Sequence, residues 1–167
     1  MRICGMNEKQ TKTSRCRGMN ATITGTGEKR CVELSVQVQI VSFSYMQGVP
    51  KDETGHGGGF VFDCRCLPNP FWEEGLRRFS GKDEPIREFF AEHCEEVEAF
   101  AGAAESLVRQ IIRVFQADGR RHLMVAFGCT GGQHRSVFMA EELARRLQGT
   151  PGLETEVVHT RAGTWRR

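Results

Sequence analysis

One stretch of the sequence concentrates the residue types best suited to binding an anion. It reads G-C-T-G-G-Q-H-R-S at 128–136, between a short apolar run and an amphipathic segment. Free backbone N–H groups and the helix dipole meet at such a helix start and favour negative charge. Glycines let the backbone approach a ligand closely, hydroxyls add hydrogen bonds, and a guanidinium matches the geometry of a phosphate. The predicted contacts with one phosphoryl group are Cys129, Thr130, Gly131, Gly132, Arg135 and Ser136.

The loop does not match a Walker A motif. That motif requires Gly-Lys followed by Ser or Thr, whereas Gly81-Lys82 is followed by Asp83. Hydrolysis of ATP or GTP by that route is therefore unsupported.

The same loop has a catalytic alternative, because its C-x5-R-S spacing resembles that of cysteine-dependent phosphatases. Cys129 would then attack phosphorus, Arg135 would bind the transition state, Ser136 would assist the leaving thiolate, and Asp63 would be the general acid. Gly128 stands where many such phosphatases have histidine. Two simpler alternatives stay open: Cys129 as a small buried residue, and the whole loop as a glycine turn that only packs a helix against a strand.

A second group of polar residues lies at the end of a predicted strand, in D-C-R-C-L-P-N-P-F-W at 63–72. Asp63 and Arg65 are two apart, so on a strand their side chains would share a face. Arg65 would add a cation to the anion site, and Asp63 would bind hydroxyls or an amine of the ligand. The alternative is a structural Asp–Arg pair that braces the turn. Phe71 and Trp72 are expected in the core or in a lid.

The elements around these motifs predict an α/β fold, a single layer of mostly parallel strands with flanking helices. Alternating or continuous apolar runs predict the strands, and apolar spacings of three and four predict the helices. The predicted strands cover 32–44, 60–67, 122–128 and 154–159, and the predicted helices cover 85–115, with a bend at Gly102, and 136–147. Functional residues then belong at the carboxyl ends of the strands.

Charge and cysteine content limit the other functions. The net charge is +2, but 1–31 holds seven basic and two acidic residues, and we expect a disordered basic leader there and one domain over 32–167. Seven cysteines, an odd number without a C-x-x-C pair, argue against a disulfide framework. No apolar stretch suits a membrane span, so we expect a cytoplasmic protein that does not contact membranes. The histidines show no metal-ligand spacing, and no metal or cofactor is expected.

Four motifs together resemble the C-terminal domain of the RapZ family of RNase adaptor proteins. They are S-F-S-Y with G-V-P at 42–50, F-D-C-R-C-L-P-N-P at 62–70, S-G-K-D at 80–83, and G-C-T-G-G-Q-H-R-S-V at 128–137, within 36–159. The resemblance implies a fold similar to a phosphofructokinase subdomain and a pocket for an amino-sugar phosphate such as glucosamine-6-phosphate. It also implies binding of small regulatory RNAs, which are presented to a ribonuclease. Carried over, the pocket residues would be Thr130, Gly131, His134 and Arg135, with Asp63 and Arg65 beside them.

The sequence departs from the family in three places. Full-length members begin with a nucleotide-binding domain that carries a Walker A motif, whereas only 1–31 precede the first strand here, which predicts a stand-alone domain. Phe71 follows the Pro-Asn-Pro turn where some members have histidine. The C-terminus has a tryptophan and three arginines, Arg161, Arg166 and Arg167, instead of a dense basic tail. These arginines would contact RNA phosphates or would simply be solvated.

The leading hypothesis is therefore a regulatory binding module without catalysis. It would sense a phosphorylated metabolite, a sugar phosphate, at the glycine-rich loop and would bind RNA locally through arginines. A cysteine phosphatase is the alternative enzyme, and a partner-binding domain with a vestigial pocket is the third reading. Self-association into a homo-oligomer stays open.

Overall fold

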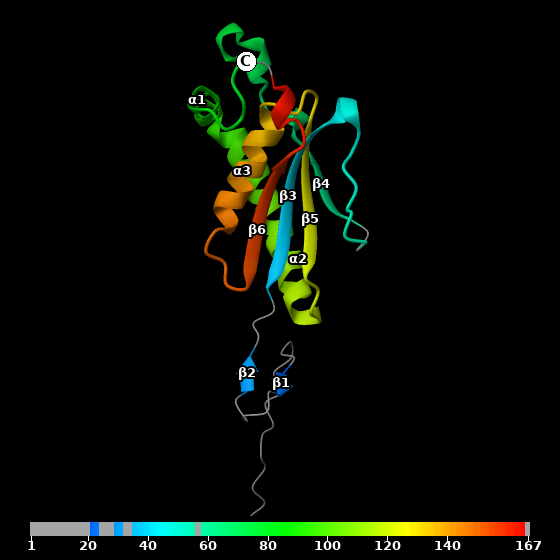
Figure 1. Cartoon of the computed structure of the whole chain (residues 1–167). Coiled ribbons are helices and arrows are strands. Elements are labelled where there is room, and N and C mark those ends of the chain that lie inside the picture. Colours follow the sequence, from blue (N-terminus) through cyan, green and yellow to red (C-terminus); the bar gives the residue numbers. More distant parts are fainter. Residues whose placement is uncertain (1–20, 24–28, 32–34, 56–57, 166–167) are drawn as a thin grey trace, which may run out of the picture.

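Four parallel strands form the central sheet, in the order β4-β5-β3-β6 (Figure 1). The computed structural model describes residues 21–23, 29–31, 35–55 and 58–165 of the 167-residue chain. The strands are β3 (Val36–Ser44), β4 (Gly59–Asp63), β5 (His122–Cys129) and β6 (Leu153–His159). The predicted α/β class with a single parallel sheet is confirmed.

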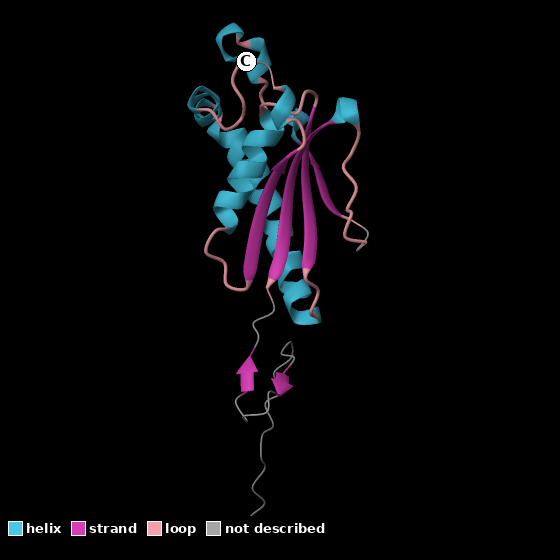
Figure 2. Cartoon of the chain, viewed as in Figure 1, coloured by secondary structure: helices cyan, strands magenta, loops and turns pink. Residues whose placement is uncertain are grey.

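Three helices join these strands (Figure 2). They are α1 (Glu84–Glu92), α2 (Cys94–Asp118) and α3 (Arg135–Leu147). Single 3₁₀ turns fill most of the connections: η1 (Tyr45–Gln47), η2 (Cys64–Cys66), η3 (Pro70–Trp72), η4 (Glu74–Leu76) and η5 (Ala162–Thr164). Within the described ranges, none of the helices combines the length and the apolarity needed to cross a bilayer.

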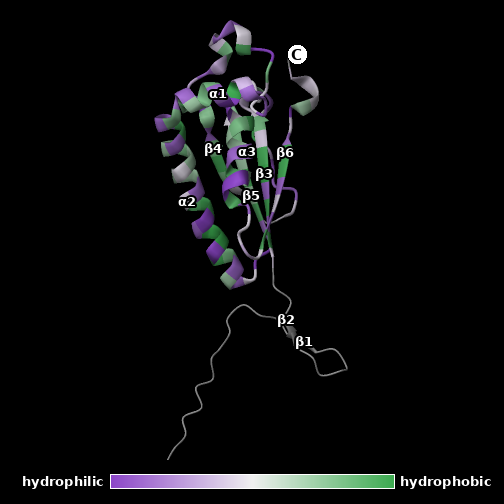
Figure 3. Cartoon of the chain, turned by 90° about the vertical axis from the view of Figure 1, so that its left-hand side faces the viewer, coloured by the Kyte–Doolittle hydropathy of each residue, from purple (hydrophilic) through white to green (hydrophobic). Residues whose placement is uncertain are grey.

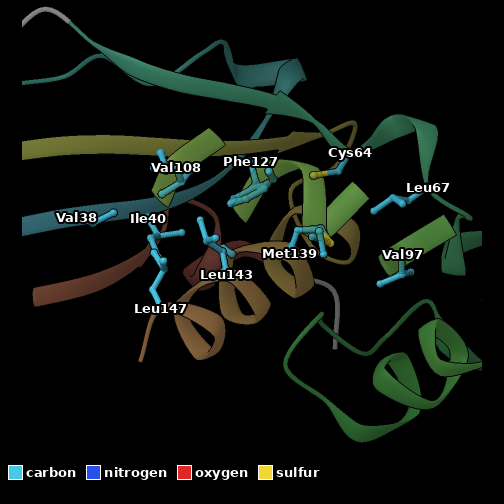
Figure 4. Packing of buried hydrophobic residues seen from close by; sticks show 14 of the residues in the cluster. Val38, Ile40, Cys64, Leu67, Val97, Val108, Phe127, Met139, Leu143 and Leu147 are labelled. Atoms are coloured by element: carbon cyan, nitrogen blue, oxygen red, sulfur yellow. The ribbon is translucent and has the colours of Figure 1, made fainter. Parts of the chain in front are cut away.

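The main core lies between one face of the sheet and the helices (Figure 4). Alternate residues of β3, Val38 and Ile40, pack there with Phe127 of β5, Val108 of α2 and Leu143 of α3. The other face of the sheet carries a smaller buried cluster of Val41, Phe43, Met124 and Ala126. α2 carries hydrophilic and hydrophobic residues in alternation along its length, as Figure 3 shows, which fits a helix with one face on the core.

The strand predicted at 60–67 is shorter in the structure. β4 ends at Asp63 instead of continuing to residue 67, because the Asp63 carboxylate accepts a hydrogen bond from the backbone N–H of Arg65 (2.9 Å) and caps η2. The expectation that Asp63 and Arg65 share a strand face is therefore wrong. Asp63 is instead the N-cap of the 3₁₀ turn η2, and Arg65 lies within that turn.

The predicted long helix is broken in a different place. His93 leaves the helical conformation (φ −111°, ψ 37°), and its N–H bonds to the carbonyl of Phe90, so α1 and α2 are separate helices. Gly102 lies inside α2, which continues through it without a break, so the bend at Gly102 stays a prediction.

The described part of the predicted leader contains two short strands that the sequence analysis did not expect. β1 (Ala21–Ile23) and β2 (Lys29–Cys31) pair in antiparallel fashion. Residues 1–20, 24–28 and 32–34 lie outside the described residues, so disorder over 1–31 stays a prediction.

Candidate functional site

The register of the sheet brings the ends of all four strands to one edge. Ser44 of β3 is paired with Cys129 of β5, Asp63 of β4 with Gly128, and His159 of β6 with Ser42. The segments that follow the strands must therefore occupy neighbouring positions in space, which is where parallel sheets bind ligands.

A cavity of about 510 Å³ opens at this edge. It falls in the size range of small-molecule sites. Its walls come from the segments after β3, β5 and β6 and from η3. The lining residues are Ser44, Met46, Asn69, Phe71, Trp72, Cys129, Thr130, Gly131, Gln133, His134, Arg135, Arg161 and Thr164.

The glycine-rich loop forms the floor of the cavity between the end of β5 and the start of α3. Gly132 has φ +68°, in the left-handed region that favours glycine. A side-chain carbon at Gly132 would also meet Cγ of Arg161 and Cβ of Ser44, each at 3.0 Å. The Ser44 hydroxyl donates to the Thr130 carbonyl (2.6 Å), and the Trp165 indole N–H donates to the Gly132 carbonyl (3.1 Å). The loop is thus held by the last residue of β3 and by the segment after β6.

The S-G-K-D motif at 80–83 packs against the end of the glycine-rich loop and the first turn of α3. The Gly81 N–H donates to the Gln133 carbonyl (2.8 Å), and a side-chain carbon at Gly81 would collide with the backbone of His134 and Phe138. The Asp83 carboxylate accepts from the backbone N–H (2.6 Å) and the hydroxyl (2.9 Å) of Ser80, which fixes the turn that carries Gly81. The motif therefore positions the first turn of α3.

Arg135, the first residue of α3, is buried against η2. Its Nη1 donates to the carbonyls of Arg65 (3.2 Å) and Leu67 (3.4 Å). Backbone oxygens thereby orient the guanidinium without neutralising its charge. In the described part of the chain no ion pair joins Arg135 to a carboxylate, and Arg135 is one of the residues that line the cavity.

His134, immediately before α3, is buried and is one of the residues that line the cavity. Its Nε2 has no hydrogen-bond partner among the described residues. Burial lowers the pKa of His134 below its ordinary value, although the nearby carbonyls of Phe79, Leu76 and Arg77 act in the opposite direction. Burial therefore favours the neutral imidazole, and Nε2 itself is enclosed by the protein.

Cys129 and Ser136 lie under the loop. The Gly132 N–H donates to Sγ of Cys129 (3.2 Å), and the same sulfur lies 3.1 Å from the Ser136 hydroxyl. Cys129 reaches the cavity wall, whereas Gly132 and Ser136 are buried and do not line it. Cys129 and Arg135, the thiol and the guanidinium that the phosphatase alternative requires, both line the cavity.

Asp63 and Arg65 lie outside the cavity. They form an ion pair (2.6 Å) that is about half exposed, and the Arg65 guanidinium stacks 4.3 Å above the Tyr45 ring. The hydrogen bond from Arg65 is the main reason why the pKa of Asp63 lies below its ordinary value. The carboxylate is thus engaged by its own turn, as the bracing alternative describes, and not aimed at a ligand on the loop.

Several lining residues were missed by the sequence analysis as ligand contacts. Ser44 is the last residue of β3, so the rule that sites lie at strand ends could have found it. Phe71 and Trp72 were expected in the core or in a lid; they line the cavity, and Trp72 is 74% exposed. For Met46, Asn69, Gln133 and Thr164, no signal in residue type or spacing pointed to the cavity.

The sequence indicated the arginines of the C-terminal segment only as contacts for RNA. The structure places Arg161 in the cavity wall, with a buried Nε that has no hydrogen-bond partner among the described residues. Arg166 and Arg167 lie outside the described residues. In the described ranges, no group of three or more His, Cys, Asp or Glu residues is arranged to hold a metal ion.

Comparison with known proteins gives a consistent family match. The family model described as the RapZ C-terminal domain matches residues 36–163. A nucleotide-binding protein of Halorhodospira halophila is 49% identical over 115 residues, which cover 69% of this chain and 37% of that protein. A nucleotide-binding protein of Saccharopolyspora erythraea is 42% identical over 127 residues, 76% of this chain and 41% of that protein. The chain thus spans about two fifths of the length of these relatives.

The two glycines of the loop should respond differently to alanine. Gly132→Ala imposes a left-handed backbone on a residue with Cβ and crowds Ser44 and Arg161, so we expect a loss of about 1–3 kcal/mol in the free energy of unfolding. Gly131→Ala is the control, because nothing lies within 4 Å of its added carbon and its φ is not positive. Urea denaturation measures both, and equal effects would contradict the described loop conformation.

The imidazole of His134 should titrate below its ordinary pKa of about 6.5 in the free protein. Inorganic phosphate should raise that pKa, because an adjacent anion favours the imidazolium. Since the folded-state pKa lies below the unfolded value, this residue costs stability as the pH falls through about 6.5. Histidine ring NMR, assigned with a His134→Gln variant, measures the titration. A His134 pKa at or above 6.5, or one that phosphate leaves unchanged, would contradict the site.

Proposed function

Because the chain belongs to the RapZ C-terminal domain family, we propose that it is a regulatory binding module whose cavity takes a phosphorylated metabolite of the sugar-phosphate class. The observation that carries the proposal is the convergence of donors on one wall of the cavity. Thr130, Gly131, His134 and Arg135, which surround the start of α3, all line the same cavity. The phosphoryl group would lie on the loop at 130–135, and the sugar would extend toward η3.

The electrostatics of this wall suit a phosphate that is held without being hydrolysed. Arg135 is fixed by carbonyl oxygens, so it brings a full positive charge that is already oriented. The N–H groups at the start of α3 add the partial positive charge of the helix dipole. Glucosamine-6-phosphate, which the family resemblance suggests, is one member of the proposed ligand class.

Substitution of Arg135 tests the phosphate site directly. Arg135→Met keeps most of the buried bulk but removes the charge, and we expect calorimetry with glucose 6-phosphate to show binding weakened by about tenfold or more. Arg113→Met is the matched control, because Arg113 is exposed near the C-terminal end of α2, before the opposite end of β5. Wild-type protein that binds neither glucose 6-phosphate nor glucosamine-6-phosphate, or an Arg135→Met variant that binds as well as wild type, would overturn the proposal.

The same protein preparations distinguish binding from turnover. An aryl phosphate that is hydrolysed by the wild type and not by Cys129→Ser would establish the phosphatase alternative, which the contacts of Gly132 and Ser136 with the sulfur favour. The position of Asp63 outside the cavity favours binding instead, because the proposed general acid would have to leave Arg65 to act.

A role in RNA binding is the second part of the proposal and rests on the family and on the terminal arginines. If the arginines at 166–167 bind RNA phosphates, replacing both by glutamine should weaken binding of a structured small RNA and flatten its salt dependence. Filter binding at about 50 and 200 mM salt measures this effect. If the double variant binds RNA with unchanged affinity and an unchanged salt slope, the terminal arginines do not contact the RNA.

A further inference from the structure

Two cysteines lie next to each other where β4 and β5 end. In the register of these strands Phe62 is paired with Phe127, and their rings stack with centroids 5.3 Å apart, so both side chains lie on one face of the sheet. Cys64 and Cys129 each follow two residues later along the chain. The register therefore brings the two cysteines to neighbouring positions at the edge where the cavity opens.

The two thiols share one buried environment. Both belong to the core cluster that contains Phe127, with exposed fractions of 0% for Cys64 and 3% for Cys129 (Figure 4). Burial raises the pKa of the Cys64 thiol well above its ordinary value, and negative charge on Cys129 acts in the same direction, as expected of sulfur atoms that lie close together. Facing Cα atoms of neighbouring strands are about 4.8 Å apart, within the span of about 4.4–6.8 Å that a disulfide requires.

The two thiols differ in their access to the cavity. Cys129 is one of the residues that line it, and its sulfur accepts a hydrogen bond from the Gly132 N–H (3.2 Å) and lies 3.1 Å from the Ser136 hydroxyl. Cys64 is not one of the lining residues and lies in the core beside Cys129. A small oxidant that enters the cavity therefore encounters Cys129 first, and Cys64 is placed to react with the product.

We propose that Cys64 and Cys129 are a redox-sensitive pair that a hydroperoxide converts to a disulfide, which weakens ligand binding at the glycine-rich loop. The weakening rests on the proposed function, since the loop at 130–135 is the proposed phosphate site. Disulfide formation itself rests only on the positions of the two thiols.

The reaction balances as two successive steps. The Cys129 sulfur attacks one oxygen of the hydroperoxide, the O–O bond breaks, and the thiol proton leaves with the other oxygen as water or an alcohol, which gives a sulfenic acid. The Cys64 sulfur then attacks the Cys129 sulfur, the S–O bond breaks, and the hydroxyl leaves with the Cys64 proton as water. Two thiols are thereby oxidised to one disulfide, and the peroxide bond is reduced by two electrons.

The disulfide acts on the loop through the Cys129 sulfur. In the reduced protein this sulfur is hydrogen-bonded to the N–H of Gly132, the residue at which the loop adopts its left-handed turn. A bond to Cys64 draws the sulfur toward β4 and removes its proton, so its contact with Gly132 weakens. The lining residues at 130–131 lie between these two positions, and the shape of the phosphate site therefore changes with the redox state.

Peptide mapping of the full chain after treatment with hydrogen peroxide tests the disulfide. Once the free thiols have been alkylated, trypsin leaves Cys64 in the peptide 52–65, separated from Cys66, and Cys129 in the peptide 122–135. We expect mass spectrometry to find these two peptides joined, with the loss of two hydrogen atoms. Dithiothreitol should separate them again by thiol–disulfide exchange.

Matched variants assign the roles of the two thiols. Cys66→Ser removes the exposed neighbouring thiol and should leave the link unchanged. Cys64→Ser should stop the reaction at the Cys129 sulfenic acid, which dimedone labels, and Cys129→Ser should give neither the link nor a label on Cys64. A link from Cys64 to Cys66, or no link at a peroxide concentration that already oxidises the exposed Cys94, would overturn the inference.

Calorimetry with glucose 6-phosphate tests the effect on the loop. Reduced wild-type protein should bind, the disulfide form should bind about tenfold or more weakly, and dithiothreitol should restore binding. Because dithiothreitol does not reduce a methionine sulfoxide, restored binding excludes oxidation of Met46 in the cavity wall as the cause. Equal binding by both forms would overturn the effect on the ligand. If the reduced protein binds no sugar phosphate, the proposed function fails, whereas peptide mapping still decides whether the disulfide forms.

Discussion

The common ending of four parallel strands at one edge of the sheet is the constraint on which the site depends. Because Ser44 is in register with Cys129 and Ser42 with His159, the chain must leave β3, β5 and β6 into the same small volume. The loop after β5 can fill that volume only by close approach of backbone to backbone. Gly132 and Gly81 provide this approach on its two sides, and neither position has room for a side chain.

The close packing of backbone around the loop also satisfies its carbonyl oxygens. The carbonyls of Thr130, Gly132 and Gln133 are satisfied by Ser44, Trp165 and Gly81, respectively. Helix α3 starts at Arg135, a residue of the cavity wall, so the positive end of the helix dipole lies at this wall. The use of these acceptors inside the protein supports the proposal that the cavity binds an anion. Arg135 brings a positive charge to the same wall.

The sequence predicted the parts of this account that depend on periodicity and on glycine. Apolar alternation located β3, the continuous run at 122–128 located β5, and the position of the glycine-rich loop before a helix indicated an anion site. The errors came from local hydrogen bonds that periodicity does not report. Asp63 caps a 3₁₀ turn and ends β4 early, and His93 separates α1 from α2. The place of Arg161 depends on how β6 and the segment after it pack on the loop, which is a tertiary property.

The central claim is that a phosphoryl group binds at the start of α3, and a crystal structure with glucose 6-phosphate tests it most directly. The account predicts phosphate oxygens within hydrogen-bond distance, about 2.7–3.2 Å, of the backbone N–H groups of the loop at 130–135 and of the Arg135 guanidinium. A phosphate bound at any other surface, with this loop empty and Arg135 still contacting only the carbonyls of Arg65 and Leu67, would contradict it.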